Sequence, residues 1–104
     1  MTEVQPVCRL DVFDGAQTLR YEALLNAMHA AVEGTRELPD GYAVRVPSDP
    51  ALFLQVAAWI TLERRCCPFL SFGLDWSASE AVWLRLTGGA AVKAFLAKRL
   101  AHKS

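Results

Sequence analysis

Two adjacent cysteines, Cys66 and Cys67, are the residues of this sequence with the clearest capacity for chemistry. They belong to the stretch ERRCCPF, in which Glu63 precedes the pair and Pro68 follows it. The chain has three cysteines, and the third is Cys8. Thiols bind soft metal ions, form disulfides and act as nucleophiles, and they also serve as small apolar side chains in a core. Three interpretations are therefore open, namely a soft-metal site, a redox or nucleophilic site, and two small apolar residues of the core.

Helical geometry places Glu63 and the two cysteines on one side of the same helix. A helix turns by about 100° per residue. With Val56 at the centre of the apolar face, Glu63 and Cys67 each lie about 20° from that centre. Cys66 lies about 80° away by the same count. A carboxylate in an apolar stripe is unfavourable unless it is paired or hydrogen-bonded, which makes Glu63 the least expected residue of the chain.

A soft metal ion or a metalloid fits this arrangement better than zinc does. Zinc sites usually separate their cysteines by two to four residues, whereas adjacent thiolates suit a larger thiophilic ion or trivalent arsenic. Cys66 and Cys67 are the predicted ligands. Cys8 is a third ligand if the N-terminal segment passes the end of this helix, and Glu63 is a ligand or an orienting group. The expected role is sensing, buffering or transfer of the ion.

Two alternatives remain open from the residues alone. In the first, the cysteines fill the gap where Pro68 turns the chain, and Glu63 accepts backbone hydrogen bonds or pairs with an arginine such as Arg45 or Arg85. The protein is then a dimerising or partner-binding module. In the second, the thiols carry redox or nucleophilic chemistry. The partial negative charge at the C-terminal end of a helix hinders thiolate formation, so we predict no catalytic residue.

Composition limits the class of protein. The chain has 104 residues, which indicates one domain spanning 1–104, and its formal net charge of zero argues against a nucleic-acid binder. No apolar run approaches the length of about 20 residues that a membrane span needs. The N-terminal sequence MTEVQPVCRLDV lacks the features of a secretory signal, so we expect a cytoplasmic protein. Cytoplasmic thiols are normally reduced, and a structural disulfide is not expected.

Capping residues predict where two helices begin and end. Asp14 and Gln17 form the pattern of a capping box at the start of a helix that Gly34 stops. A second helix begins at Pro50, after Ser48 or Asp49 as its cap. Pro68 lacks an amide hydrogen and clashes with the preceding turn, so this helix is expected to end near the two cysteines.

Four strands and a last helix complete the predicted fold. Residues 7–13 alternate loosely and predict a first strand, and residues 42–46 predict a second after the turn LPDGY. The runs 69–76 and 80–88 are expected to form a hairpin, and a last helix follows Gly88-Gly89. The order β-α-β-α-β-β-α is typical of a two-layer α+β sandwich, with three helices on one face of a small, largely antiparallel sheet.

Surplus bulky side chains favour a contact with another chain. The strand within 80–88 carries large residues on both faces, which predicts a central strand or an interface. Leu54 falls outside the apolar stripe of its helix. A chain of this length cannot cover every apolar surface, so a homodimer is expected, and a different protein partner is the alternative.

The stretch ERRCCPFLSF at 63–72 resembles the signature E-R-x-C-C-P-F-x-x-F of a family of small uncharacterised bacterial proteins. The blocks at 38–42, 82–88 and 92–96 resemble further parts of the same family, and Cys8 matches an N-terminal cysteine. Similar segments occur beside or fused to metal-responsive regulators. The resemblance implies no established activity, but it favours the motif's glutamate and cysteines as functional residues and strengthens the interpretation as a metal site.

Overall fold

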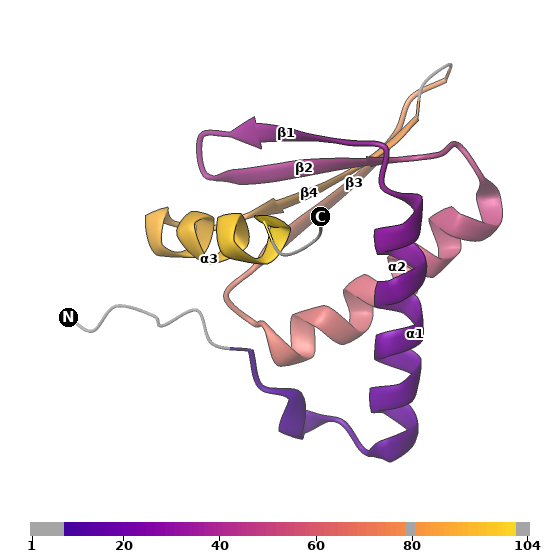
Figure 1. Ribbon diagram of the computed structural model, residues 1–104, viewed down its shortest axis with the longest axis vertical. Coiled ribbons are helices and arrows are strands. Elements are labelled where there is room, and N and C mark those ends of the chain that lie inside the picture. Colours follow the sequence, from indigo (N-terminus) through magenta and orange to yellow (C-terminus); the bar gives the residue numbers. More distant parts are fainter. Residues whose placement is uncertain (1–7, 79–80, 102–104) are drawn as a thin grey trace.

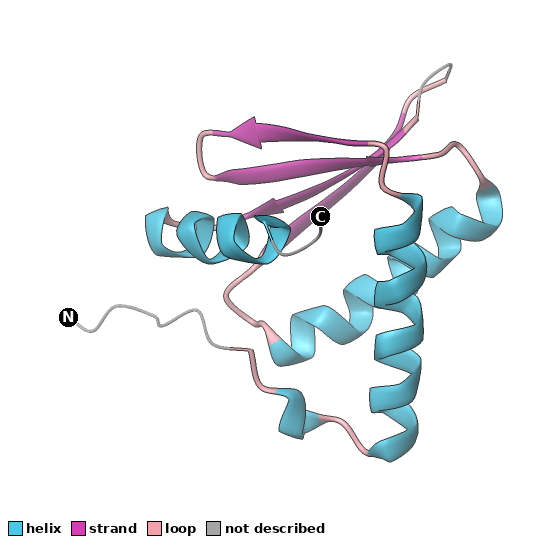
Figure 2. Cartoon of the chain, in the orientation of Figure 1, coloured by secondary structure: helices cyan, strands magenta, loops and turns pink. Residues whose placement is uncertain are grey.

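Three α-helices lie on one face of a four-stranded antiparallel sheet in the computed structural model, which describes residues 8–78 and 81–101 (Figure 1). The elements in chain order are the 3-10 helix η1 (Leu10–Val12), α1 (Gly15–Ala31), β1 (Gly34–Leu38), β2 (Gly41–Val46), α2 (Pro50–Cys66), β3 (Ser71–Trp76), β4 (Val82–Thr87) and α3 (Ala90–Ala101). The strand order across the sheet is β1-β2-β4-β3. Figure 2 shows the helices together on one side of the strands. The predicted two-layer α+β class is confirmed.

The first strand of the sheet follows α1, and the strand predicted at 7–13 is wrong. The described part of that segment contains η1, whereas residue 7 lies outside the described residues. Strand β1, which was not predicted, pairs with β2 through the turn at Pro39-Asp40, in register from Gly34↔Arg45 to Leu38↔Gly41. A hairpin closed by a two-residue turn forms readily. It occupies the sheet position next to β2, on the side away from β4.

The helix boundaries follow the capping residues of the sequence. Asp14 accepts a hydrogen bond from the backbone of Gln17 at 2.8 Å, and the Gln17 side chain accepts one from the Asp14 backbone at 3.1 Å. Pro50 is the first residue of α2, and the Asp49 side chain accepts from the next backbone amide. Cys66 is the last residue of α2, immediately before the Cys67 cap. The predicted starts of both helices and the end of α2 are confirmed.

The core lies between the sheet and the helices. Strand β4 is central, as predicted, and alternates buried Val82, Leu84 and Leu86 with residues on the opposite face. From α2, the fully buried Val56 and the nearly buried Trp59 pack against this surface. Among the described elements, no helix covers the outer face of the sheet (Figure 1). The predicted homodimer or protein partner stays a prediction.

Candidate metal and thiol site at the end of helix α2

The three cysteines of the chain meet at the C-terminal end of α2. Their sulfur atoms all lie within 4.8 Å of one another. Cys66 and Cys67 are fully buried, and Cys8 is partly buried. A backbone hydrogen bond of 2.7 Å from Arg9 N–H to the Cys66 carbonyl holds the N-terminal segment against the helix end. This contact places Cys8 beside the vicinal pair. The prediction that Cys8 is a third ligand depends on this position.

A disulfide joins two of the three cysteines, Cys8 and Cys67, with an S–S distance of 2.06 Å. Cys66 is a free thiol, and its sulfur lies 3.5 Å from that of Cys67. The expectation that the chain holds no disulfide is therefore wrong. The contact of Arg9 with the helix end brings the Cα atoms of Cys8 and Cys67 to 4.6 Å, which is within the usual range for a disulfide.

Glu63 is fully buried and accepts hydrogen bonds from three side chains. Tyr21 Oη donates to its Oε1 at 2.6 Å, and Arg99 Nη1 donates to its Oε2 at 2.7 Å. The Cys66 sulfur lies 3.5 Å from Oε1 and is the third donor. The carboxylate thus has the partners that its place in an apolar stripe requires, and it orients the thiol of Cys66.

The arginine beside Glu63 comes from α3, and the suggested partners Arg45 and Arg85 are elsewhere. Arg45 pairs with Glu33, and Arg85 pairs with Asp75. Both of these arginines belong to the set of residues on the outer face of the sheet, because each alternates with buried residues on its strand.

Sequence reasoning missed Tyr21 and Arg99 as parts of this site. Tyr21 shares the buried face of α1 with Leu24 and Met28, but a buried tyrosine hydroxyl usually needs a hydrogen-bond partner. Arg99 stands seven residues after the buried Val92, so it falls on the inner face of α3. The arginines nearest to Glu63 on α2, Arg64 and Arg65, are exposed and lie on other faces of the helix. A buried glutamate without a cation on its own helix face and an arginine on the inner face of another helix are signals that together indicate the pair.

Burial, together with the negative charge of Glu63, raises the pKa of the Cys66 thiol from its ordinary value of 9.0 to about 11. Burial also raises the pKa of Tyr21, and Glu63 adds to this effect, so the phenol remains a donor. Cys66 is therefore protonated at neutral pH. A protonated, buried thiol is a poor nucleophile, whereas a bound cation can displace its proton.

Comparisons with protein-family models, with curated proteins and with solved structures find no match for this chain. The resemblance to the E-R-x-C-C-P-F-x-x-F family stays a prediction. In the part of the chain that the structure describes, no helix has both the length and the apolar character needed to cross a membrane. The functional assignment accordingly depends on the geometry of the cysteine cluster.

Proposed function

We propose that the reduced protein binds a thiophilic metal ion or metalloid through Cys8, Cys66 and Cys67, in order to sense, buffer or transfer it. The mutual approach of the three sulfur atoms within 4.8 Å carries this proposal. Thiolates select soft ions, and three convergent sulfurs can bind one ion together. The partly buried Cys8 gives the ion a route to two sulfurs that are otherwise fully enclosed.

The charge balance of the site favours a trivalent metalloid such as arsenic. Three thiolates neutralise a trivalent centre completely, whereas a divalent ion leaves one negative charge. Glu63 and Arg99 already neutralise each other at 2.7 Å. A buried net charge is unfavourable, so the neutral complex fits this environment best. Glu63 orients the Cys66 thiol before binding, and it keeps Tyr21 and Arg99 as donors once the Cys66 proton has left.

Reduction of the disulfide generates the site. An external dithiol transfers two electrons and two protons to the Cys8–Cys67 bond and becomes a disulfide itself, which leaves three thiols in the protein. Arsenous acid, As(OH)₃, then forms three As–S bonds, and each thiol proton leaves with one hydroxide as water. The oxidised protein has the single free thiol of Cys66 and holds no three-sulfur site. Redox state thus controls binding.

A thiol-redox function is the second candidate, and the Cys8–Cys67 disulfide beside a free thiol is the observation that favours it. In that function, Cys66 or an external thiol exchanges with the disulfide. The raised pKa of Cys66 weakens it as the attacking group, because the thiolate is the reactive form. Trapping of a mixed disulfide between the chain and a small thiol, with no affinity for arsenite, would favour this candidate over metal binding.

Equilibrium dialysis against arsenite tests the proposed function. The protein is kept reduced with a phosphine, and the same protein with its disulfide intact is the matched control. We expect the reduced protein to bind one arsenic atom, the oxidised protein to bind none, and Cys66→Ser to weaken binding by more than about tenfold, which is about 1.4 kcal/mol. Equal affinity of the wild type and Cys66→Ser, with both proteins shown to be folded by circular dichroism, contradicts the proposal.

A further inference from the structure

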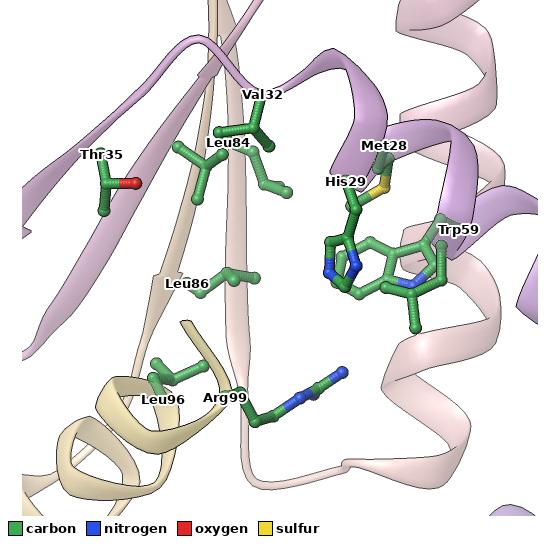
Figure 3. Close-up of a pocket in the computed structure, with 11 residues that line it drawn as sticks. Met28, His29, Val32, Thr35, Trp59, Leu84, Leu86, Leu96 and Arg99 are labelled. Atoms are coloured by element: carbon green, nitrogen blue, oxygen red, sulfur yellow. The ribbon is translucent and has the colours of Figure 1, made fainter. Parts of the chain in front are cut away.

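A cavity of about 100 Å³ lies on the helix side of the sheet, and none of the three cysteines is among the residues that line it. Figure 3 shows Leu84 and Leu86 on the sheet side, Met28 and Trp59 on the helix side, and Arg99 extending from α3. Exposed residues His29 and Thr35 also line it, so it opens to solvent at this rim. The three helices approach the sheet from different directions and leave this space between them.

The lining has a definite chemical character. Most of its residues are apolar, and no carboxylate is among the described residues that line it. Arg99 is the one lining residue with a permanent positive charge. Its Nη1 donates to Glu63, and a guanidinium carries five N–H donors in total. Donors for an incoming acceptor therefore remain on this side chain, and arginine binds carboxylates through charge-assisted hydrogen bonds. Glu63 already neutralises the guanidinium, but the Arg99 side chain is 31% exposed, so a second carboxylate bound here stays in contact with solvent and is not a buried net charge.

A second donor in the lining residues lacks a partner. Trp59 is 2% exposed, and its Nε1 is buried without a hydrogen bond to any part of the chain that the structure describes. Buried polar groups are nearly always hydrogen-bonded in proteins, so an unpaired one requires an explanation. A bound molecule with an acceptor oxygen provides one, because Trp59 belongs to the wall of the cavity.

We propose that this cavity is a binding site for a small branched-chain carboxylate. Its apolar body lies among Leu84, Leu86 and Leu96, and its carboxylate accepts hydrogen bonds from Arg99. An apolar cavity of about 150 Å³ accommodates benzene, so the present volume suits a body no larger than an isobutyl group. No cysteine lines the cavity, and the two sites are linked through Arg99, which also donates to Glu63. The proposal does not depend on an ion at the cysteines.

Nuclear magnetic resonance of the ¹⁵N-labelled, disulfide-intact protein tests this proposal with isovalerate as the probe. The three tryptophans give separate indole N–H signals, and the signal lost in Trp59→Phe identifies Trp59. We expect isovalerate to shift this signal saturably, with a Kd of about 1 mM or below. The signals of Trp83, on the outer face, and of Trp76, which donates to Ser48, are internal controls and stay unchanged.

Isovaleramide, which has the same apolar body without the charge, tests the carboxylate class. We expect it to bind at least about tenfold more weakly than isovalerate, because a charged acceptor forms the stronger hydrogen bond with a guanidinium. Equal binding of acid and amide overturns the assignment of a carboxylate. The absence of a saturable shift at Trp59, or equal shifts of all three indole signals, overturns the binding site itself.

A pair of surface variants tests the location. Thr35→Phe adds a ring at the exposed rim without changing a buried residue, and Ser71→Phe adds the same ring at an exposed position of β3 away from the cavity. We expect Thr35→Phe to abolish the isovalerate-induced shift of Trp59 and Ser71→Phe to leave it intact. Retention of the full shift in Thr35→Phe contradicts binding within this cavity.

Discussion

Two arginine–carboxylate pairs of similar length stand in opposite environments in this molecule. The Arg99–Glu63 pair spans 2.7 Å, and its carboxylate is fully buried between α2 and α3. The Arg85–Asp75 pair spans 3.0 Å on the outer face of the sheet, where about half of each side chain is exposed. Distance alone therefore does not determine how much an ion pair contributes to the free energy of unfolding, because the two pairs differ in their exposure to solvent.

The buried pair contacts a thiol of the cysteine cluster, whereas the exposed pair lies on the opposite face of the sheet. Glu63 also accepts hydrogen bonds from Tyr21 and Cys66, so its charge orients a thiol of the cysteine cluster. Arg85 instead lies flat over Gly73, where an added Cβ would come within 2.3 Å of its guanidinium. Gly73 thus leaves room for the Arg85 side chain on the sheet surface. Solvent screens the exposed pair there. Four predictions test how far this contrast extends.

Removal of Arg99 is expected to have the largest effect. Arg99→Met leaves the Glu63 charge buried without a cation, which costs about 3–5 kcal/mol of unfolding free energy. The double variant Arg99→Met/Glu63→Leu should recover most of this loss, because it removes the isolated charge. Urea denaturation at pH 7 measures both. A loss below about 1 kcal/mol in Arg99→Met would show that the buried pair behaves like a surface pair.

Reduction of the disulfide is expected to have the next largest effect. Cys8 and Cys67 are separated by 59 positions in the sequence, and closing a long loop stabilises a fold by about 2–4 kcal/mol, mainly through the unfolded state. The urea midpoint of the wild type should fall on reduction, and that of Cys8→Ser should not change. A reducing agent that shifts both proteins equally would indicate an effect unrelated to this bond.

Stability is expected to decrease in alkaline solution because of Cys66. Its pKa is about 11 in the folded protein and 9.0 ordinarily. The folded state therefore retains the thiol proton more strongly than the unfolded state. The resulting contribution to the free energy of unfolding is fully present below pH 9 and is lost as the pH rises towards 11. The contribution amounts to about 3 kcal/mol, from two pKa units at about 1.4 kcal/mol each. Unfolding measurements between pH 8 and 11 should show the loss in the wild type, and an equally steep loss in Cys66→Ala would contradict it.

The exposed pair is expected to give the smallest effect. Asp75→Asn removes the partner of Arg85 where both side chains are about half exposed, and such pairs contribute about 0–1 kcal/mol. The urea midpoint of Asp75→Asn should lie close to that of the wild type, and high salt should reduce the difference between the two proteins further. A loss comparable to that of Arg99→Met would mean that the outer face is covered in solution, as in a homodimer that forms through this face.

The sequence predicts the helices and the position of Glu63 well, because local signals determine them. Asp14 and Pro50 mark helix starts, and helical periodicity places Glu63 among buried residues. The first strand was misplaced because residues 34–38 acquire their structure from pairing with β2 rather than from alternation of their own. Strand pairing of this kind depends on context more than helix formation does.

The cysteine cluster was only partly predictable. Cys66 and Cys67 are neighbours in the sequence, so their joint burial follows from one helix face. The approach of Cys8 depends on contacts between the N-terminal segment and α2, among them the bonds from Arg9 N–H to the Cys66 carbonyl and from Arg65 to the Val12 carbonyl. The Arg99 contact depends on how α3 packs over the sheet. Tertiary packing establishes both long-range contacts. The approach of Cys8 leaves no local pattern, whereas the Arg99 contact leaves an indirect one, an arginine on the inner face of α3 and a glutamate on that of α2.

Native mass spectrometry of the protein with one equivalent of arsenite is the most direct test of the three-sulfur site. The account predicts one arsenic atom per reduced chain, with the loss of three thiol protons, and no arsenic on the chain whose Cys8–Cys67 disulfide is intact. Reduced protein that takes up no arsenic, or takes it up equally well as the Cys66→Ser/Cys67→Ser variant, would contradict the account.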